Sequence, residues 1–312
     1  MWRQCLVLIV FSTSGWAAQC ATAQFRLGDD EPTVADPTDE LTPYDHRALE
    51  LGLARGWIPS GQAFEPLIAD PRWPVGHVGL QTYIDDDNLG DGALLSIGIS
   101  KAMWRVTGGP WMLEAGGQGA VFPIFDLTAG NDMLNADYMG AAYFSARKER
   151  FSLFARLRHV STHIGDEFLI REDAEREDFG FEQFDFIVSQ DFFGDYGTSQ
   201  PRVRAYGGVG WIPGEPYDPD WGKGSFIWGL EATGDKTFGL LRPVFAVNVK
   251  QQEGRNFAPD VSVRTGLQLD SESGGAGSTL RLMLEYYYGR EVNGQFWEDD
   301  LQYVGLGFFL HI

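Results

Sequence analysis

The sequence has little cysteine, fewer basic than acidic residues, and no long apolar run beyond its N-terminal region. Its only two cysteines are Cys5 and Cys20. The chain after residue 23 therefore contains no cysteine, which excludes a disulfide scaffold, a thiolate metal site and a cysteine nucleophile there. The 24 Lys and Arg against 44 Asp and Glu give a net charge of −20, which disfavours nucleic acid as a partner. No run of about 18 apolar residues follows residue 23, which excludes a transmembrane helix but not membrane-crossing strands.

The first residues have the three-part layout of a secretory signal peptide. Arg3 carries the positive charge, an apolar run over residues 5–11 follows, and Ala21-Thr22-Ala23 resembles a cleavage site of the A-x-A type. We therefore predict a signal peptide over residues 1–23 and export of the remaining chain. Loss of Arg3 takes the net charge to −20 − 1 = −21.

Residues 24–75 form a separate region ahead of the patterned part of the chain. They begin as an acidic stretch that we expect to be flexible, and residues 44–56 are compatible with a short helix. The stretch 57–75 is rich in proline and is predicted to be irregular. We expect it either to plug the lumen of the domain that follows or to cover its periplasmic end.

From residue 76 to residue 312, short segments of alternating polarity are separated by clusters of Gly, Pro, Asn and Asp. The predicted strands are 77–85, 91–106, 111–122, 136–147, 150–163, 180–191, 201–211, 225–234, 242–251, 259–270, 279–290 and 299–312. Period-two patterning predicts an all-β fold. The even number of strands is typical of a single antiparallel up-and-down transmembrane β-barrel of about 12 strands.

The alternation puts apolar side chains on one face of each strand and polar ones on the other. Leu282 and Leu284, for example, share a face opposite Arg281 and Glu285. In a soluble protein the apolar face would be a core, whereas in a membrane barrel it would face lipid. Export without cysteine favours the membrane, as do aromatic residues near strand ends that are typical of an interfacial girdle. These aromatic residues are Trp104, Trp111, Tyr286, Tyr287, Tyr288, Trp297 and Tyr303.

The final stretch, residues 303–310, resembles the C-terminal insertion signal of outer-membrane barrels. We therefore predict a location in the bacterial outer membrane, with membrane lipid and the barrel assembly machinery as partners. The charged residues predicted to face the lumen would either line a channel or pair with one another and close it. They are Arg156, Arg158, Asp185, Asp191, Arg202, Arg204, Arg281 and Glu285.

One predicted strand, residues 150–163, breaks the alternation. Arg156 and Arg158 should point into the lumen, so His159, Ser161 and His163 continue the outward row, where polar groups are costly. A His and a Ser two residues apart on a strand share a face, so the imidazole can act as a base for the hydroxyl.

A third group has to orient that imidazole. Antiparallel pairing of the next strand would bring Glu182 beside His159. Asp166 and Glu167, in the connecting loop, are alternatives.

The outward motif His159-Val160-Ser161 is similar to that of outer membrane phospholipase A, and lipid A deacylase uses a related His-x-Ser with a Glu on the next strand. The resemblance implies Ser161 as nucleophile, His159 as base and Glu182 as orienting acid. Thr162-His163 stands where the phospholipase motif continues with Asn-Gly. Calcium assists that phospholipase, so the resemblance also implies calcium, and we expect no other cofactor.

A wider resemblance, to a bacterial family of unknown function, covers most of the chain. Its elements are the segment 66–74, the motif 159–167, the strand at Tyr206-Gly207-Gly208 and the turn at Gly294-Gln295-Phe296. This resemblance implies an exported barrel and no established activity.

Three hypotheses for the outward polar residues stay open. The first is a membrane-embedded lipid acyl-ester hydrolase, and the second is that His159, Ser161 and His163 merely hydrogen-bond a surface loop to its strand. The third is a metal site formed by His163, Asp166 and Glu167. If the outward residues have no chemical role, the protein would be a passive porin-like channel or a structural barrel.

Overall fold

The computed structural model describes residues 55–84, 90–128, 130–172, 180–194, 200–214, 221–237, 241–270 and 279–311, all within one compact unit. The predictions for residues 1–54, including the signal peptide, lie outside the described residues. Among the described residues, no helix is both long enough and apolar enough to cross a bilayer.

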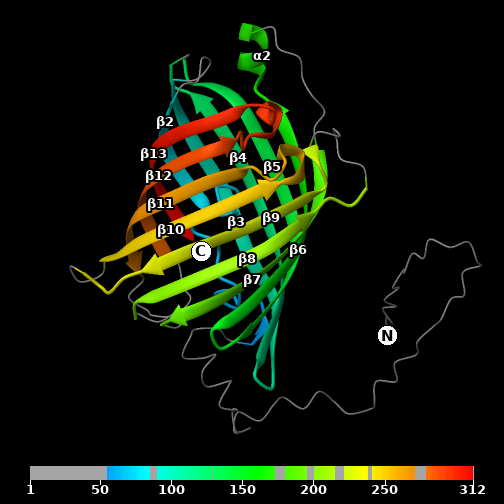
Figure 1. Ribbon diagram of the computed structural model, residues 1–312, viewed down its shortest axis with the longest axis vertical. Coiled ribbons are helices and arrows are strands. Elements are labelled where there is room, and N and C mark those ends of the chain that lie inside the picture. The colour runs from blue at the N-terminus through cyan, green and yellow to red at the C-terminus, as the bar shows by residue number, and fades with distance from the viewer. Residues whose placement is uncertain are drawn as a thin grey trace, which may run out of the picture. The chain divides into compact units, whose positions relative to one another are not determined.

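The described chain is built almost entirely from antiparallel strands (Figure 1). The strands are β1 (Gly56–Trp57), β2 (Gly76–Tyr83), β3 (Asp91–Gly108), β4 (Trp111–Asp126), β5 (Asp132–Lys148), β6 (Phe151–Ile164), β7 (Gly180–Phe193), β8 (Arg202–Trp211), β9 (Gly224–Thr233), β10 (Leu241–Gln252), β11 (Pro259–Asp270), β12 (Thr279–Arg290) and β13 (Asp300–His311). Helix α2 (Asp166–Glu172) follows β6, and the 3-10 turns η2 (Glu253–Arg255) and η3 (Gly294–Phe296) follow β10 and β12.

Strands β2 to β13 form a closed barrel in which each strand pairs with its neighbours along the chain. The barrel closes where β13 pairs with β2, with Leu306 opposite Leu80. The short β1 adds to the far end of β3, where Gly56 pairs with Arg105. All twelve predicted strands are therefore confirmed, and the largest boundary errors are the end of β4 and the start of β5.

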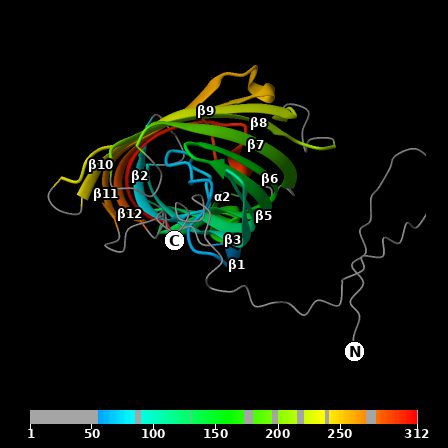
Figure 2. The same ribbon diagram turned by 90° about the horizontal axis from the view of Figure 1, so that it is seen from below.

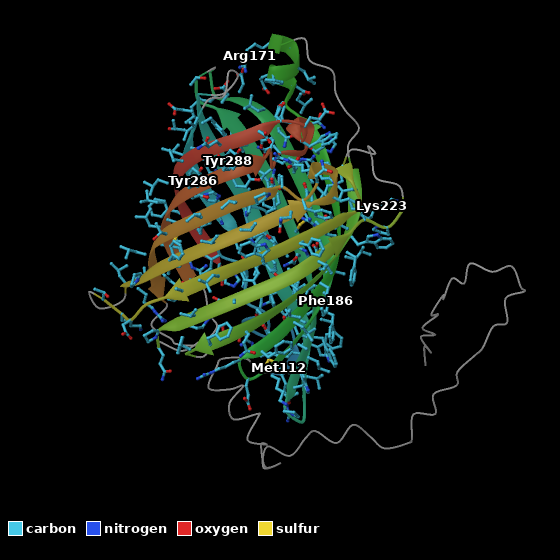
Figure 3. The ribbon with its side chains drawn as sticks, in the orientation of Figure 1. Met112, Arg171, Phe186, Lys223, Tyr286 and Tyr288 are labelled. Atoms are coloured by element: carbon cyan, nitrogen blue, oxygen red, sulfur yellow. The ribbon has the colours of Figure 1, made fainter. Side chains whose placement is uncertain are left out.

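The two faces of the barrel wall differ as the alternation predicts. Outward positions carry exposed apolar side chains such as Leu282 and Leu284, whereas the alternating positions Arg281, Met283 and Glu285 are buried inside. Phe186, Tyr286 and Tyr288 lie on the outer surface in Figure 3. A closed barrel leaves no sheet edge unpaired, and an apolar outer face suits lipid.

The predicted aromatic girdle is wrong in part, because three of its members lie inside the barrel. Tyr287, Trp297 and Tyr303 are buried, and the rings of Tyr287 and Tyr303 stack with centroids 5.6 Å apart. Tyr287 and Tyr303 occupy inward positions of their strands, so alternation overrides any preference of tyrosine for the membrane interface.

The lumen is occupied by residues 58–75, which we call the plug. Figure 2 shows this segment, in blue, within the ring of strands. Phe64, Leu67 and Trp73 are buried, and the ring centroids of Phe64 and Trp73 lie 5.0 and 5.2 Å from that of Phe154 on β6. Each fully buried side chain of this size contributes about 1.5–3 kcal/mol relative to an exposed one. Of the two predicted alternatives, the plugged lumen is therefore confirmed.

After β1 the chain pairs with no strand in a regular ladder, so side chains of the wall make hydrogen bonds to the backbone N–H and carbonyl groups of the plug. These bonds run from Ala63 N–H to Glu114 and from Ile68 N–H to Glu231, and from Arg147, Arg204 and Arg264 to the carbonyls of Ala63, Glu65 and Ile68. The inward charged side chains of the barrel therefore hold this irregular segment in one conformation by binding its backbone.

Candidate functional site

The outward polar residues lie near the end of β6 that leads into α2 (Figure 1). Arg156 and Arg158 are buried in the lumen, as predicted. Leu157 and His159, which alternate with them, are exposed on the outer face. The alternation of β6 therefore continues without a bulge, and only the chemistry of the outward row changes.

The pairing of β6 with β7 places Glu182 directly opposite His159. The His159 Nδ1 atom and the Glu182 Oε1 atom are 2.9 Å apart, which is hydrogen-bonding distance. Both side chains are about three-fifths exposed, at 58% and 59%. The acid that the sequence predicts beside this histidine is therefore within reach of it, and the loop alternatives Asp166 and Glu167 are not its partners in the structure.

Ser161 continues the outward row two residues beyond His159 and pairs with Gly180. A Cβ atom on Gly180 would lie 3.2 Å from the Val160 carbonyl oxygen and 3.9 Å from both the His159 Cε1 atom and the Ser161 Cα atom, so any larger residue here would contact both members of the outward row. Among the described residues, no hydrogen bond joins Ser161 to His159. Rotation about a single χ1 angle moves the serine hydroxyl, and catalytic hydrogen bonds are often unformed without substrate.

The surface on the barrel-centre side of the pair is apolar. Leu157 precedes His159 on β6, and Phe184 and Phe186 follow Glu182 on β7, all exposed outward. The pair therefore lies at the boundary between an apolar belt and the polar rim, where an ester group of a membrane lipid would be found.

The structure separates the members of the predicted metal site. His163 is exposed and meets the ring of Tyr138 edge-on, with centroids 5.4 Å apart. Asp166 and Glu167 lie in the first turn of α2. Within the described part of the chain, no three His, Cys, Asp or Glu side chains gather closely enough to hold a metal ion.

Helix α2 is attached to the barrel by other residues. Gly165 N–H donates to the Leu134 carbonyl at 2.9 Å, and Arg171 pairs with Asp126 and Asp132 at 3.2 and 2.5 Å. Figure 3 shows Arg171 at this rim. The described part of the loop is thus anchored to β4 and β5, without a contribution from His159 or Ser161.

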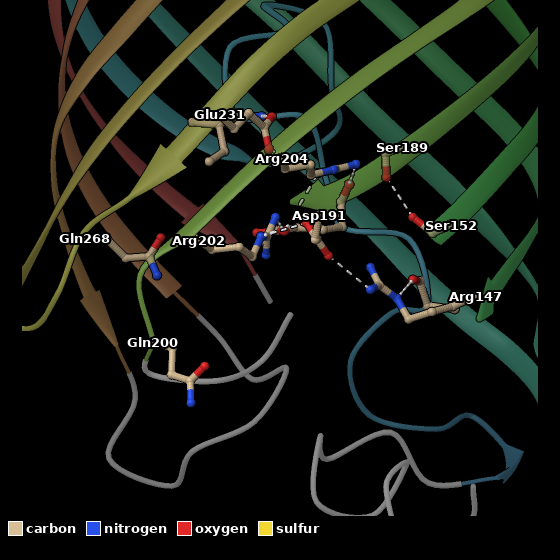
Figure 4. Close-up of polar contacts among 12 residues, drawn as sticks. Arg147, Ser152, Ser189, Asp191, Gln200, Arg202, Arg204, Glu231 and Gln268 are labelled. Carbon is tan, nitrogen blue, oxygen red and sulfur yellow. Dashed lines mark hydrogen bonds and ion pairs between the residues drawn. The ribbon is translucent and has the colours of Figure 1, made fainter. Parts of the chain in front are cut away.

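On the other side of the wall, the lumen charges pair as one of the two sequence hypotheses predicts. Asp185 binds Arg156 at 2.7 Å and Arg158 at 3.3 Å. Asp191 lies between Arg202 and Arg147, at 3.0 and 3.5 Å (Figure 4). Buried acids and bases therefore neutralise one another.

Sequence reasoning missed the plug residue that lies at the centre of this network, Glu65. Burial alone would raise the pKa of its carboxyl group, but Arg202, Arg204 and Arg281 outweigh burial and lower that pKa to about 2. The Glu65 carboxylate contacts Arg202 directly. Inward arginines on β8 and β12 indicate that an acidic partner is needed, but their positions in the sequence do not identify that acid.

A family described as "Protein of unknown function (DUF1207)" matches residues 19–312. No curated protein matches the chain at a significant level. Among solved structures, outer membrane phospholipase A from Escherichia coli aligns with 13% identity and a TM-score of 0.50, covering 77% of this chain and 94% of its own. The calcium-bound phospholipase dimer of Salmonella typhi aligns with 12% identity and a TM-score of 0.51, covering 78% and 94%. At these identities the likeness shows the fold, a bacterial outer-membrane β-barrel.

Proposed function

The chain belongs to the DUF1207 family, whose function is unknown, and we propose that it is a lipid acyl-ester hydrolase acting on the outer face of the barrel. Ser161 is the nucleophile, His159 the general base, and Glu182 the residue that orients the imidazole. The observation that carries the proposal is the 2.9 Å contact between His159 Nδ1 and Glu182 Oε1 at the edge of the apolar outer belt.

The arrangement supports a two-step acyl transfer. Glu182 accepts a hydrogen bond from the protonated Nδ1 of His159, which leaves Nε2 free to take the proton of the Ser161 hydroxyl. The serine oxygen adds to the ester carbonyl, the lipid alcohol leaves with the proton from Nε2, and an acyl-serine remains. Water, deprotonated by the same nitrogen, then releases the fatty acid and restores the hydroxyl.

The outward contact has no evident structural use. An exposed ion pair contributes only about 0–1 kcal/mol to stability, and the described part of the loop after β6 is held by Arg171 rather than by this pair. The alternative of loop anchoring therefore lacks a contact in the described residues, whereas catalysis needs the pair where it stands.

The fold supports the same choice. Two solved barrels with matching architecture carry the name phospholipase, and one of them contains calcium. Since the described acids near His163 do not converge on one point, we assign no catalytic step to a metal ion. Calcium enters only as a variable of the assay below.

The alternative function, a passive porin-like channel, meets an obstacle in the plug. Residues 62–69 of the plug are buried in the lumen, and the plug backbone is hydrogen-bonded to side chains of the wall. Conduction would require the plug to leave the barrel. We therefore place the chemistry on the outer face and expect the resting barrel to be electrically silent.

The test is hydrolysis of phospholipid and lipopolysaccharide acyl chains by the purified barrel in lipid vesicles, with and without calcium. We expect fatty acid release by the wild-type chain and a loss of at least a thousandfold in Ser161→Ala. Ser152→Ala is the matched control, because Ser152 lies on the same strand but faces the lumen. A wild-type barrel inert on both lipids, or an active Ser161→Ala, would overturn the proposal.

A further inference from the structure

A cavity of about 120 Å³ lies in the lumen between the plug and the rim segment 291–294. At roughly 30 Å³ per water molecule, a space of this size holds about four waters, or one small organic molecule. Much of its lining is apolar or aromatic, including Phe122, Met139, Phe181, Ile187, Trp221 and Tyr287. Small-molecule sites commonly combine such walls with a few convergent polar groups.

The acids that line this cavity already have partners. Asp137 pairs with Arg72 at 2.6 Å, Asp185 with Arg156 at 2.7 Å, and Asp260 with Arg255 at 3.3 Å. Asp70 accepts the backbone N–H of Arg72. Glu291 accepts two hydrogen bonds from Asn293, and burial raises its pKa to about 7, so it is partly neutral near that pH. Each of these acids therefore already has a hydrogen-bonding or ion-pair partner.

Lys250 on β10 lines the same cavity and differs from these groups. Its ammonium makes no hydrogen bond or ion pair with any residue that the structure describes. Asp260 lies across from it on β11, but Asp260 Oδ1 accepts the backbone N–H of Arg290 at 2.8 Å and contacts Arg255. A charge left without a partner inside a barrel is costly, and a bound anion would offset that cost.

Two guanidinium groups lining the cavity have donors to spare. Arg290 Nη1 is buried and has no hydrogen-bond acceptor among the described residues, and Arg158 Nε makes no hydrogen bond there beyond its ion-pair contact with Asp185 at 3.3 Å. Arg290 is held over the rings of Trp221 and Trp297, at 5.4 and 5.2 Å. An ammonium and two guanidinium groups thus line one cavity with apolar walls.

We propose that this cavity binds a small organic carboxylate, whose anionic group meets Lys250 and whose apolar body packs against the aromatic wall. A monoanion fits better than a phosphate dianion, because Asp70, Asp185 and Asp260 line the same space and would repel the second charge. The site lies inside the barrel, whereas His159 lies on its outer face. Carboxylate binding can therefore be present or absent whether or not the proposed hydrolase activity exists.

Binding is tested with 4-fluorobenzoate by fluorine NMR, using the complete barrel in lipid nanodiscs. Neutral 4-fluorobenzamide and cationic 4-fluorobenzylamine are probes of the same shape. We expect saturable broadening of the benzoate signal alone, at least a tenfold weaker affinity in Lys250→Met, and recovery in Lys250→Arg. Lys148→Met, an exposed position at the end of β5, should bind as the wild type does.

Three results would contradict the carboxylate site. The amide binding as tightly as the benzoate would show an apolar cavity without anion recognition. Preferential binding of the amine would show that the acidic side chains, and not Lys250, determine which charge the cavity binds. An unchanged affinity in Lys250→Met, with the variant confirmed as folded by its heat-dependent gel mobility, would place the probe elsewhere.

Discussion

Each face of strands β6 and β7 carries a pair made of one basic and one acidic side chain, but the inner pair is buried and the outer pair is exposed. Inside, Arg156 and Asp185 are buried and lie 2.7 Å apart, and the Arg156 guanidinium lies 5.0 Å from the ring centroid of Trp73 in the plug. Outside, His159 and Glu182 lie 2.9 Å apart, are largely exposed and contact an apolar belt. The inner pair is explained by structure alone, whereas the outer pair contributes little to stability, which is why we assign it a chemical role.

The largest effect should come from breaking an inner pair. Arg105 and Glu114 are fully buried against each other, and Glu114 also accepts the N–H of Ala63 in the plug. Glu114→Leu leaves the guanidinium without its acid and should lower the free energy of unfolding by about 3–5 kcal/mol. Urea unfolding in lipid bilayers, followed by tryptophan fluorescence, measures this. An unchanged midpoint would show that the inner charges are not structural.

The next effect concerns the hold on the plug and depends on pH. Because the folded-state pKa of Glu65 is lowered, its contribution is present above about 4.5 and is lost as pH falls toward about 2. We expect planar-bilayer recordings to be silent at pH 7 and to show openings as the pH falls below about 4. Glu65→Gln should open at neutral pH and respond less to acid. Openings equally rare in both proteins at every pH would contradict the role of Glu65.

A smaller effect distinguishes two serines on the same strand. The hydroxyl of Ser152 lies 2.7 Å from that of Ser189 in the buried wall (Figure 4). Ser152→Ala should therefore lower the free energy of unfolding by about 1 kcal/mol and leave lipid hydrolysis unchanged. Ser161→Ala should show the reverse in the same two assays. Equal effects of the two substitutions on either measurement would contradict the assignment of a structural role to the inner serine and a chemical role to the outer one.

The smallest stability effect should come from removing the outer pair altogether. His159→Leu combined with Glu182→Leu should change the free energy of unfolding by less than about 1 kcal/mol, because exposed ion pairs contribute little and leucine suits a lipid-facing row. The same protein should lose lipid hydrolysis entirely. A strongly destabilised double variant would instead mean that the pair holds the barrel wall together.

The sequence predicts the strands well because the signal is local. Alternation in residues such as Leu282 and Glu285 is set by the pleat of a single strand, so no knowledge of neighbours is needed. The start of β5 is missed by four residues, since Leu134 and Asn135 are both buried there and interrupt the alternation next to a register shift. The same alternation places Tyr287 and Tyr303 at inward positions, so it would have excluded both from the predicted aromatic girdle.

Contacts between distant residues were beyond the reach of the sequence. The pairing of His159 with Glu182 was predictable because β6 and β7 are consecutive strands, which pair as neighbours in an up-and-down barrel. The seating of Phe64 against Phe154 was not, since the plug has no repeating pattern and its place depends on the shape of the whole lumen. Lys250 was missed for the same reason, because an unpaired charge is recognisable only when all its neighbours are known.

The central claim is that Ser161 is an activated nucleophile, and covalent labelling tests it most directly. The wild-type barrel in lipid vesicles is treated with an alkyl fluorophosphonate, digested and analysed by mass spectrometry, alongside the His159→Leu and Ser152→Ala proteins. We predict one adduct, on Ser161, in the wild-type and Ser152→Ala proteins and none in His159→Leu. Absence of an adduct on Ser161 in the wild type, or equal labelling of Ser161 without His159, would contradict the assignment.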